Sequence, residues 1–304
     1  MLSPIEARAQ LYLCPFLPMK TLSSLLPLLL VASLTTACTS RAASHSASQT
    51  TSISSSDPCE ENGRSDDGRA RVCEEQTFTL DARDLVLDAS TNGGVKVTAW
   101  DRDEIEVVAR IQAQAPTESE ARQLVEATRI ETGRTVRAIS PDTDSRTGRQ
   151  HSWVSTSFEV RVPRSTDLDL KALNGGISVE GVQGEIRAET INGGISIHKA
   201  AGDVRARTTN GGVSVGLAGG AWDGSGLDVE TVNGGISISI PNDYSADLTA
   251  STQMGRISAD GLATRGRHQR GQWTGETIEG EIGQGGAPIR AVTTNGGVSI
   301  RRGR

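Results

Sequence analysis

The sequence predicts an all-β protein: a parallel β-solenoid with about 18 residues per coil, plus a small α+β insertion near its N-terminal end. The first observation is that the triplet Asn-Gly-Gly occurs six times, and three consecutive copies stand 18 residues apart. Self-similarity at a fixed period is the signature of repeat folds. The second observation is composition, because 34 glycines and only 3% aromatic residues suit a thin interior. The triplets begin at Asn92, Asn174, Asn192, Asn210, Asn233 and Asn295.

Apolar residues alternate on both sides of each triplet, which predicts strands. Two apolar residues separated by one follow the triplet, as in Ile177 and Val179, and a second alternating set precedes it. We infer a nine-residue unit of one strand and one turn, with two units per coil. A three-sided left-handed helix built from hexapeptides is excluded, since it would place Gln183 inside. The apolar positions recur through Ile177, Ile186, Ile195, Val204 and Val213.

Stacking the coils at a spacing of 18 predicts the neighbours of several outward residues. Lys171 would lie over Glu189, and Glu189 over Arg207, so that opposite charges meet on adjacent strands. The asparagines would form a column able to make a side-chain ladder. The glycines of the triplet would supply positive φ angles where the chain turns sharply. We interpret all three features as structural and not as binding sites.

The repeat loosens after Asn233. We expect degenerate turns at Met254–Ser258 and at 279–282, and surface loops at 216–226 and 261–275. Loops on a rigid scaffold are where ligand contacts are sought. Three aromatic residues in or near these irregular turns are therefore candidate ligand contacts, namely Trp222, Tyr244 and Trp273.

An α+β insertion is predicted over 101–165. A strand is expected at Ile105–Ile111, and then a helix opened by a capping box of Thr117 and Glu120 and running to about Ile130. One face of this helix carries Ala121, Leu124, Val125 and Thr128. Two further strands are expected, at Val136–Ile139 and Val154–Val162.

The N-terminal 1–37 predicts an export signal. Lys20 precedes a short apolar run rich in small residues, a pattern typical of a cleaved secretory signal and too short to span a bilayer. Met19 makes a better start than Met1. The run ends in Leu34-Thr35-Thr36-Ala37-Cys38, which resembles a bacterial lipobox, so Cys38 would carry the lipid. By that resemblance Thr39 favours the outer membrane, and the alternative is an ordinary signal peptide with Cys38 incidental.

Two cysteines remain in the mature chain, Cys59 and Cys73. In an exported protein they predict a disulfide, which would stabilise the fold by roughly 3 kcal/mol by closing a short loop. The alternative is a fragment of a metal site, although no His or Cys nearby completes one. We therefore expect a Ser/Thr-rich tether over 38–58, a disulfide loop over 59–76 and the main domain over 77–304.

Motifs for chemistry are lacking. The net charge of −6 argues against a nucleic-acid partner. Calcium-binding β-rolls need Asp at the sixth position from each Gly-Gly. None of the six positions here is Asp, so no calcium rungs are expected. Carboxylates alternate with Arg and Lys in columns and no pair is singled out, so we expect no enzyme, no metal and no cofactor. The sixth positions hold Thr98, Glu180, His198, Gly216, Ser239 and Arg301.

The Asn-Gly-Gly-[Ile/Val]-Ser-[Ile/Val] turns, the strand Phe158–Pro163 and the strand-helix-strand segment before it together resemble the bacterial putative-adhesin family of β-strand-repeat domains of unknown function. The resemblance covers 77–304 and brings no catalytic residues with it. Together with the export signal and the lipobox, it leads us to expect a non-enzymatic, lipid-anchored protein of the cell envelope, facing the periplasm or the surface, that binds an envelope protein or a glycan. A carbohydrate-active β-helix, either a lyase or a hydrolase, and an envelope-stress or scaffolding protein are the alternatives.

Overall fold

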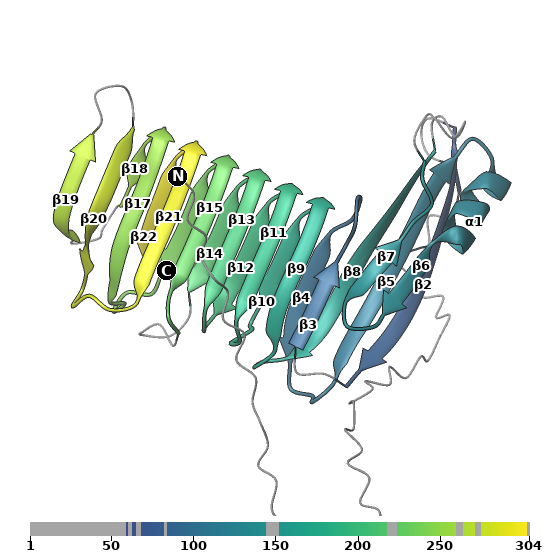
Figure 1. The fold of residues 1–304 in the computed structure, drawn as a ribbon, viewed down its shortest axis with the longest axis horizontal. Helices are drawn as coiled ribbons and strands as arrows, with labels where there is room; N and C mark the ends of the chain where they lie inside the picture. The colour runs from purple at the N-terminus through teal and green to yellow at the C-terminus, as the bar shows by residue number, and fades with distance from the viewer. Residues whose placement is uncertain are drawn as a thin grey trace, which may run out of the picture. The chain divides into compact units, whose positions relative to one another are not determined.

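The computed structural model describes residues 59, 63–64, 68–81, 84–143, 152–217, 224–259, 264–270 and 275–302. Their secondary structure is dominated by strands, with one α-helix in this part of the chain (Figure 1). No helix among them is long and apolar enough to cross a membrane. The predicted signal peptide, Cys38 and the tether lie outside the described residues, as do Trp222 and Trp273.

The strands form two large sheets of mixed direction, and in neither does the strand order close into a barrel. In spatial order, the first sheet consists of β1 (Gly63–Arg64), β2 (Ala70–Leu80), β5 (Ile105–Ala115), β8 (Trp153–Pro163), β4 (Val95–Trp100), β10 (Ile177–Glu180), β12 (Ile195–Ala200), β14 (Val213–Leu217), β16 (Ile236–Ile240), β22 (Val298–Arg302) and β18 (Ile257–Ser258). The second consists of β19 (Thr264–Arg270), β20 (Glu276–Ile282), β17 (Ala246–Met254), β21 (Pro288–Asn295), β15 (Leu227–Asn233), β13 (Val204–Asn210), β11 (Ile186–Asn192), β9 (Asp167–Asn174), β3 (Asp84–Asp88), β7 (Val136–Ile139) and β6 (Arg129–Thr132).

Between β9 and β16 the chain alternates strand by strand between the two sheets, and neighbours within each sheet are parallel (Figure 1). The predicted spacing of 18 is confirmed by the pairing of Ile177 with Ile195 and of Ile195 with Val213. It also places Glu189 between Lys171 and Arg207, as expected. The register therefore follows the sequence repeat.

The main core lies between the two sheets, because the inward residues of each strand are buried and the outward ones are not. Ile186, Ala188 and Ile197, for example, have no exposed surface. Small and β-branched residues make up most of this core, as predicted, but our expectation that large rings would not fit is wrong, because Phe78, Phe158 and Tyr244 also pack in it. Where the rings of Phe158 and Tyr244 enter it, they are buried.

The Asn-Gly-Gly turn, which we call the corner, connects a strand of the second sheet to the next strand of the first. A Cβ placed on its first glycine would lie 2.0 Å from the carbonyl oxygen of the preceding corner, as for Gly193 against Gly175. Of the first glycines, only Gly93 and Gly296 have φ in the left-handed region, at 150° and 156°. Our prediction that the triplets need glycine for positive φ is thus wrong for most corners. Stacking of one corner directly on the next is what requires it.

Two columns of side-chain hydrogen bonds hold the corners together. Each asparagine Nδ2 donates to the Oδ1 of the asparagine before it, with 2.8 Å from Asn192 to Asn174, so the predicted ladder is confirmed. It continues along the whole column, through Asn92, Asn174, Asn192, Asn210, Asn233 and Asn295. Buried threonines add a second column, in which the Thr208 hydroxyl donates to the Gly193 carbonyl at 2.8 Å.

The segment between β4 and β9 contains the helix, α1 (Glu118–Ala127). Thr117 caps it by accepting a hydrogen bond from the Glu120 amide, as predicted. The helix ends at Ala127 and not near Ile130, because the chain enters β6 at Arg129. Its apolar face, including Leu124 and Val125, packs with β5 and β2 in a second, smaller core.

The C-terminal strands depart from prediction. Residues 279–282, expected as a turn, belong to β20, which pairs antiparallel with β17. The expected loop at 261–275 contains β19, which pairs antiparallel with β20. Met254–Ser258 does form a corner, with Met254 paired to Asn295 where the other corners have asparagine. At 216–226, β14 extends to Leu217.

Candidate binding surface

A groove of about 790 Å³ runs across the outward face of the first sheet, over β4, β10, β12, β14 and β16. Its floor follows from the repeat. In Asn-Gly-Gly-Ile-Ser-Ile the isoleucines point inward, so the serine between them points outward. The second glycine of each corner leaves the main chain uncovered beside that serine.

The serines form one column across the sheet, because parallel strands pair them in register. Ser178 pairs with Ser196, Ser196 with Ser214 and Ser214 with Ser237. The column continues through Ser299 to Ser258 at the end of the sheet. The serine between the two isoleucines of the motif is the sequence signal for this array, and it was not among the predicted site residues.

Charged side chains form ion pairs on this face, and Lys96, Arg110 and Glu159 among them line the groove. Arg110 of β5 donates to the Glu75 carboxylate at 2.8 Å, and both side chains are partly buried. Lys96 lies 3.9 Å from Glu159. Lys199 donates to Glu180 at 3.0 Å, and this hydrogen bond lowers the pKa of the Glu180 carboxyl.

Ser196 and His198 lie together in this face, with 2.9 Å between the hydroxyl oxygen and Nε2. They are two residues apart on β12, so the alternation of the strand alone brings them to the same side. Gly216 is the register partner of His198 on β14, and Glu180 its partner on β10. The carboxylate of Glu180 forms its ion pair with Lys199.

The outward face of the second sheet carries a second groove, of about 630 Å³. One side is a column of alternating charge that includes Glu189, Arg207 and Glu230, and the other includes Ile191 and Val232, which are 46% and 43% exposed. Arg207 Nε lies 3.1 Å from Glu230. Glu230 of this column also pairs with Arg290.

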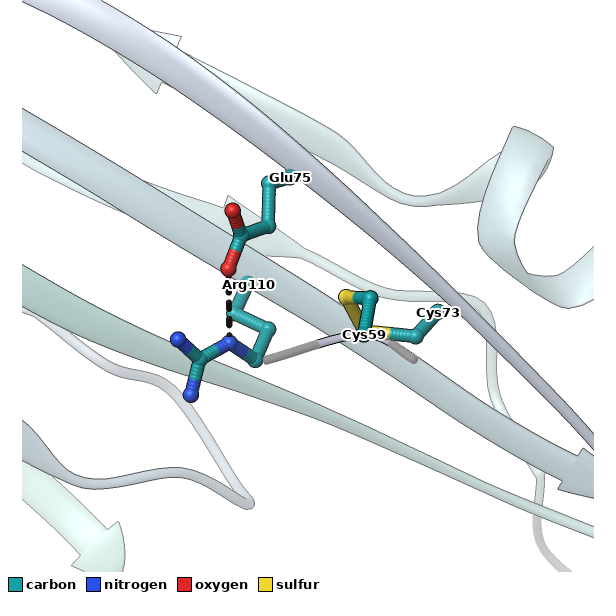
Figure 2. Close-up of a disulfide and its surroundings, with 4 residues drawn as sticks. All are labelled: Cys59, Cys73, Glu75 and Arg110. Carbon is teal, nitrogen blue, oxygen red and sulfur yellow. Dashed lines mark hydrogen bonds and ion pairs between the residues drawn. A yellow bond between two sulfur atoms is a disulfide. The ribbon is translucent and has the colours of Figure 1, made fainter. Parts of the chain in front are cut away.

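The predicted disulfide is present (Figure 2). Cys59 and Cys73 are bonded, with Cα atoms 5.4 Å apart, so the alternative of a two-cysteine metal fragment is wrong. Cys73 already belongs to β2, which makes the loop shorter than expected. Figure 2 shows Glu75 and Arg110 beside the bridge, so the same stretch of β2 carries both cross-links.

Of the three aromatic candidates, only Tyr244 lies in the described part of the chain. It is 2% exposed and packs in the main core, so its ring presents no face to a ligand. Burial raises the pKa of its hydroxyl, which has no hydrogen-bond partner among the residues that the structure describes. Among the described residues, no group of three or more His, Cys, Asp and Glu side chains could hold a metal ion.

No family model matches the chain, and no curated protein does. A putative cell adhesion protein from Clostridium sporogenes is similar in structure, at a TM-score of 0.37 and 9% identity over 76% of this chain and 100% of that one. A putative adhesin from Bacteroides fragilis has a TM-score of 0.30 and 10% identity over 75% and 96%. A putative lipid binding protein from Parabacteroides distasonis has a TM-score of 0.23 and 10% identity over 76% and 97%. Putative adhesins therefore stand among the structural neighbours.

Proposed function

We propose that this protein is an exported, lipid-anchored, non-enzymatic parallel β-solenoid, with coils of about 18 residues, that presents a binding surface at the bacterial cell envelope. One observation carries the proposal. The groove on the first sheet repeats the same serine and the same bare glycine backbone on strand after strand.

A repeating surface suits a repeating or extended partner. Parallel strands stand about 4.8 Å apart, so the serine hydroxyls form an evenly spaced array on a rigid support. Each hydroxyl can donate one hydrogen bond and accept others. Many weak, equivalent contacts along a chain favour an envelope glycan or an extended segment of an envelope protein.

The charged groups in and around the groove support binding over catalysis. General acid–base catalysis needs a carboxyl or imidazole poised to exchange a proton with the substrate. Glu75, Glu159 and Glu180 instead each have a cationic partner within 4 Å. Carboxylates held in such ion pairs are better suited to fixing the shape of the groove.

Export and anchoring are proposed from the N-terminal sequence and supported by the cysteine bridge. Disulfides persist in oxidising compartments and are rare in the bacterial cytoplasm. Replacing Cys38 with serine is expected to abolish labelling by a palmitate analogue and to release the protein from the membrane fraction. Unchanged labelling and fractionation of Cys38→Ser would rule out the anchor.

The binding surface is tested by filling the groove. Ser214→Trp places a large ring on its floor, whereas Thr209→Trp places the same ring on the second sheet, beside the other groove. Binding to a glycan array and to isolated envelope should fall at least tenfold for Ser214→Trp and stay near wild type for Thr209→Trp. Equal binding by both variants would contradict the assignment. Turnover of a polysaccharide that depends on one carboxylate would favour the carbohydrate-active alternative.

A further inference from the structure

In the first sheet, one type of backbone hydrogen bond recurs between each parallel strand and its neighbour in spatial order. The amide of the residue after the corner donates to the corner carbonyl of the following strand. The distances are 3.0 Å for Ile195 to Gly212, 2.9 Å for Val213 to Gly235 and 3.0 Å for Val298 to Arg256. At β18 the series reaches the last strand in the order of this sheet.

There the acceptor changes from a carbonyl to a side chain. The amide of Ile257 donates to Oε2 of Glu276 at 2.6 Å, a buried contact. Glu276 begins β20 of the second sheet and is only 4% exposed. Its carboxylate thus occupies the place that the corner carbonyl of one more strand would fill.

A carboxylate in this position is costly to bury unless its oxygens are hydrogen-bonded. Glu279 and Glu281 of the same strand are exposed, so burial of an acidic residue is not a general property of β20. The antiparallel pairing of β20 with β17 sets Glu276 opposite Thr252, next to the corner that leads into β18. The pairing of β20 with β17 therefore places the carboxylate at the end of the neighbouring sheet.

We propose that Glu276 is a stop that prevents a second copy of this chain from adding a strand to β18. Edge strands are templates for pairing with another chain. The occupant excluded here is a second copy, because identical edges can pair about a two-fold axis. A strand arriving at β18 would have to displace the buried Glu276 side chain from the amide it needs.

The inference is independent of the proposed binding surface, since Glu276 does not line either groove. The test uses the full chain in a Cys38→Ser background, so that no lipid contributes to association. Mass is measured by light scattering after size exclusion over a hundredfold range of concentration, for wild type, Glu276→Ala, Glu276→Gln and the exposed control Glu279→Ala.

Wild type and Glu279→Ala are expected to stay monomeric, and Glu276→Ala to form dimers or larger species as concentration rises. Glu276→Gln keeps an acceptor oxygen and should associate less than Glu276→Ala. A folded Glu276→Ala that remains monomeric throughout would overturn the proposal, as would equal association of the Glu279→Ala control.

Hydrogen exchange keeps the proposal testable if Glu276→Ala fails to fold. In the wild-type protein the Ile257 amide should exchange roughly ten- to a hundredfold more slowly than an unbonded edge amide, as expected for a hydrogen bond to a carboxylate. Exchange of Ile257 at the rate of an exposed amide would show that the stop is not formed.

Discussion

The strands from β9 to β16 and those from β17 to β20 solve the same problem differently. In the first region every strand pairs with the equivalent strand of the next repeat, so the same corner sequence connects the strands each time. In the second region the chain turns back, and β20 and β19 pair antiparallel. Repeated sequence on neighbouring strands therefore builds the stack of corners, whereas the end of the stack depends on residues that occur once, such as Glu276.

The largest expected effect is steric and belongs to the regular region. Gly193→Ala would place a methyl 2.0 Å from the Gly175 carbonyl oxygen, whereas Gly194→Ala leaves 3.3 Å to its nearest neighbour. We expect Gly193→Ala to lower the free energy of unfolding by about 3 kcal/mol or more, and Gly194→Ala to change it by less than about 1 kcal/mol. Urea unfolding measures both. Similar losses would mean that backbone freedom, and not corner stacking, demands glycine.

The threonine column should contribute less. Thr208→Val keeps the shape of the side chain but removes the hydroxyl that bonds to the Gly193 carbonyl, at a cost of about 1–2 kcal/mol. Thr209→Val, at the exposed neighbouring position, should be near neutral. The difference between the two variants in urea midpoint reports the hydrogen bond. Equal midpoints for the two variants would show that the threonine hydrogen bonds do not stabilise the corners.

The ladder can be extended into the irregular region. Met254 is 63% exposed and pairs with Asn295, whose Oδ1 would accept from an asparagine there. Met254→Asn should therefore be more stable than Met254→Ala by about 0.5–1 kcal/mol in thermal or urea unfolding. If the two variants unfold alike, the irregular region does not follow the corner rules of the stack.

The smallest expected effect depends on pH. The Asp203 carboxylate accepts hydrogen bonds from Ser225, which lower the pKa of Asp203 below its ordinary value of 3.8. A lowered folded-state pKa stabilises the fold above the unfolded value, and this contribution is lost as pH falls through the folded value. Asp203→Asn should thus be less stable than wild type at pH 7 and approach it below pH 3.8. A stability gap that is constant with pH would contradict this role.

The sequence predicted the register and the ladder because both follow from residues that recur at one spacing. Lys171, Glu189 and Arg207 needed only that spacing to be placed. It did not predict why the corners need glycine, since a demand for positive φ and a close approach of two backbones select the same residue. The φ angles of the corners, and the 2.0 Å between a Cβ built on Gly193 and the Gly175 carbonyl oxygen, distinguish them.

The antiparallel pairing of β17, β20 and β19 could not be predicted from the sequence for a different reason. Glu279–Ile282 resembles a corner locally, but it pairs antiparallel with a strand more than twenty residues earlier, and no period encodes that pairing. The groove, in contrast, was accessible from the sequence. Alternation alone places Ser178 and Ser196 on the outer face, and the register then aligns them.

The asparagine ladder has a direction. Its side-chain amides all donate toward the N-terminal end of the stack, as from Asn192 to Asn174. The backbone amide at the same corner donates the opposite way, from Gly175 to the Asn192 carbonyl at 3.1 Å. The two rows of dipoles therefore oppose each other and partly cancel. Each added corner therefore contributes a smaller dipole along the stack than the asparagine ladder alone would.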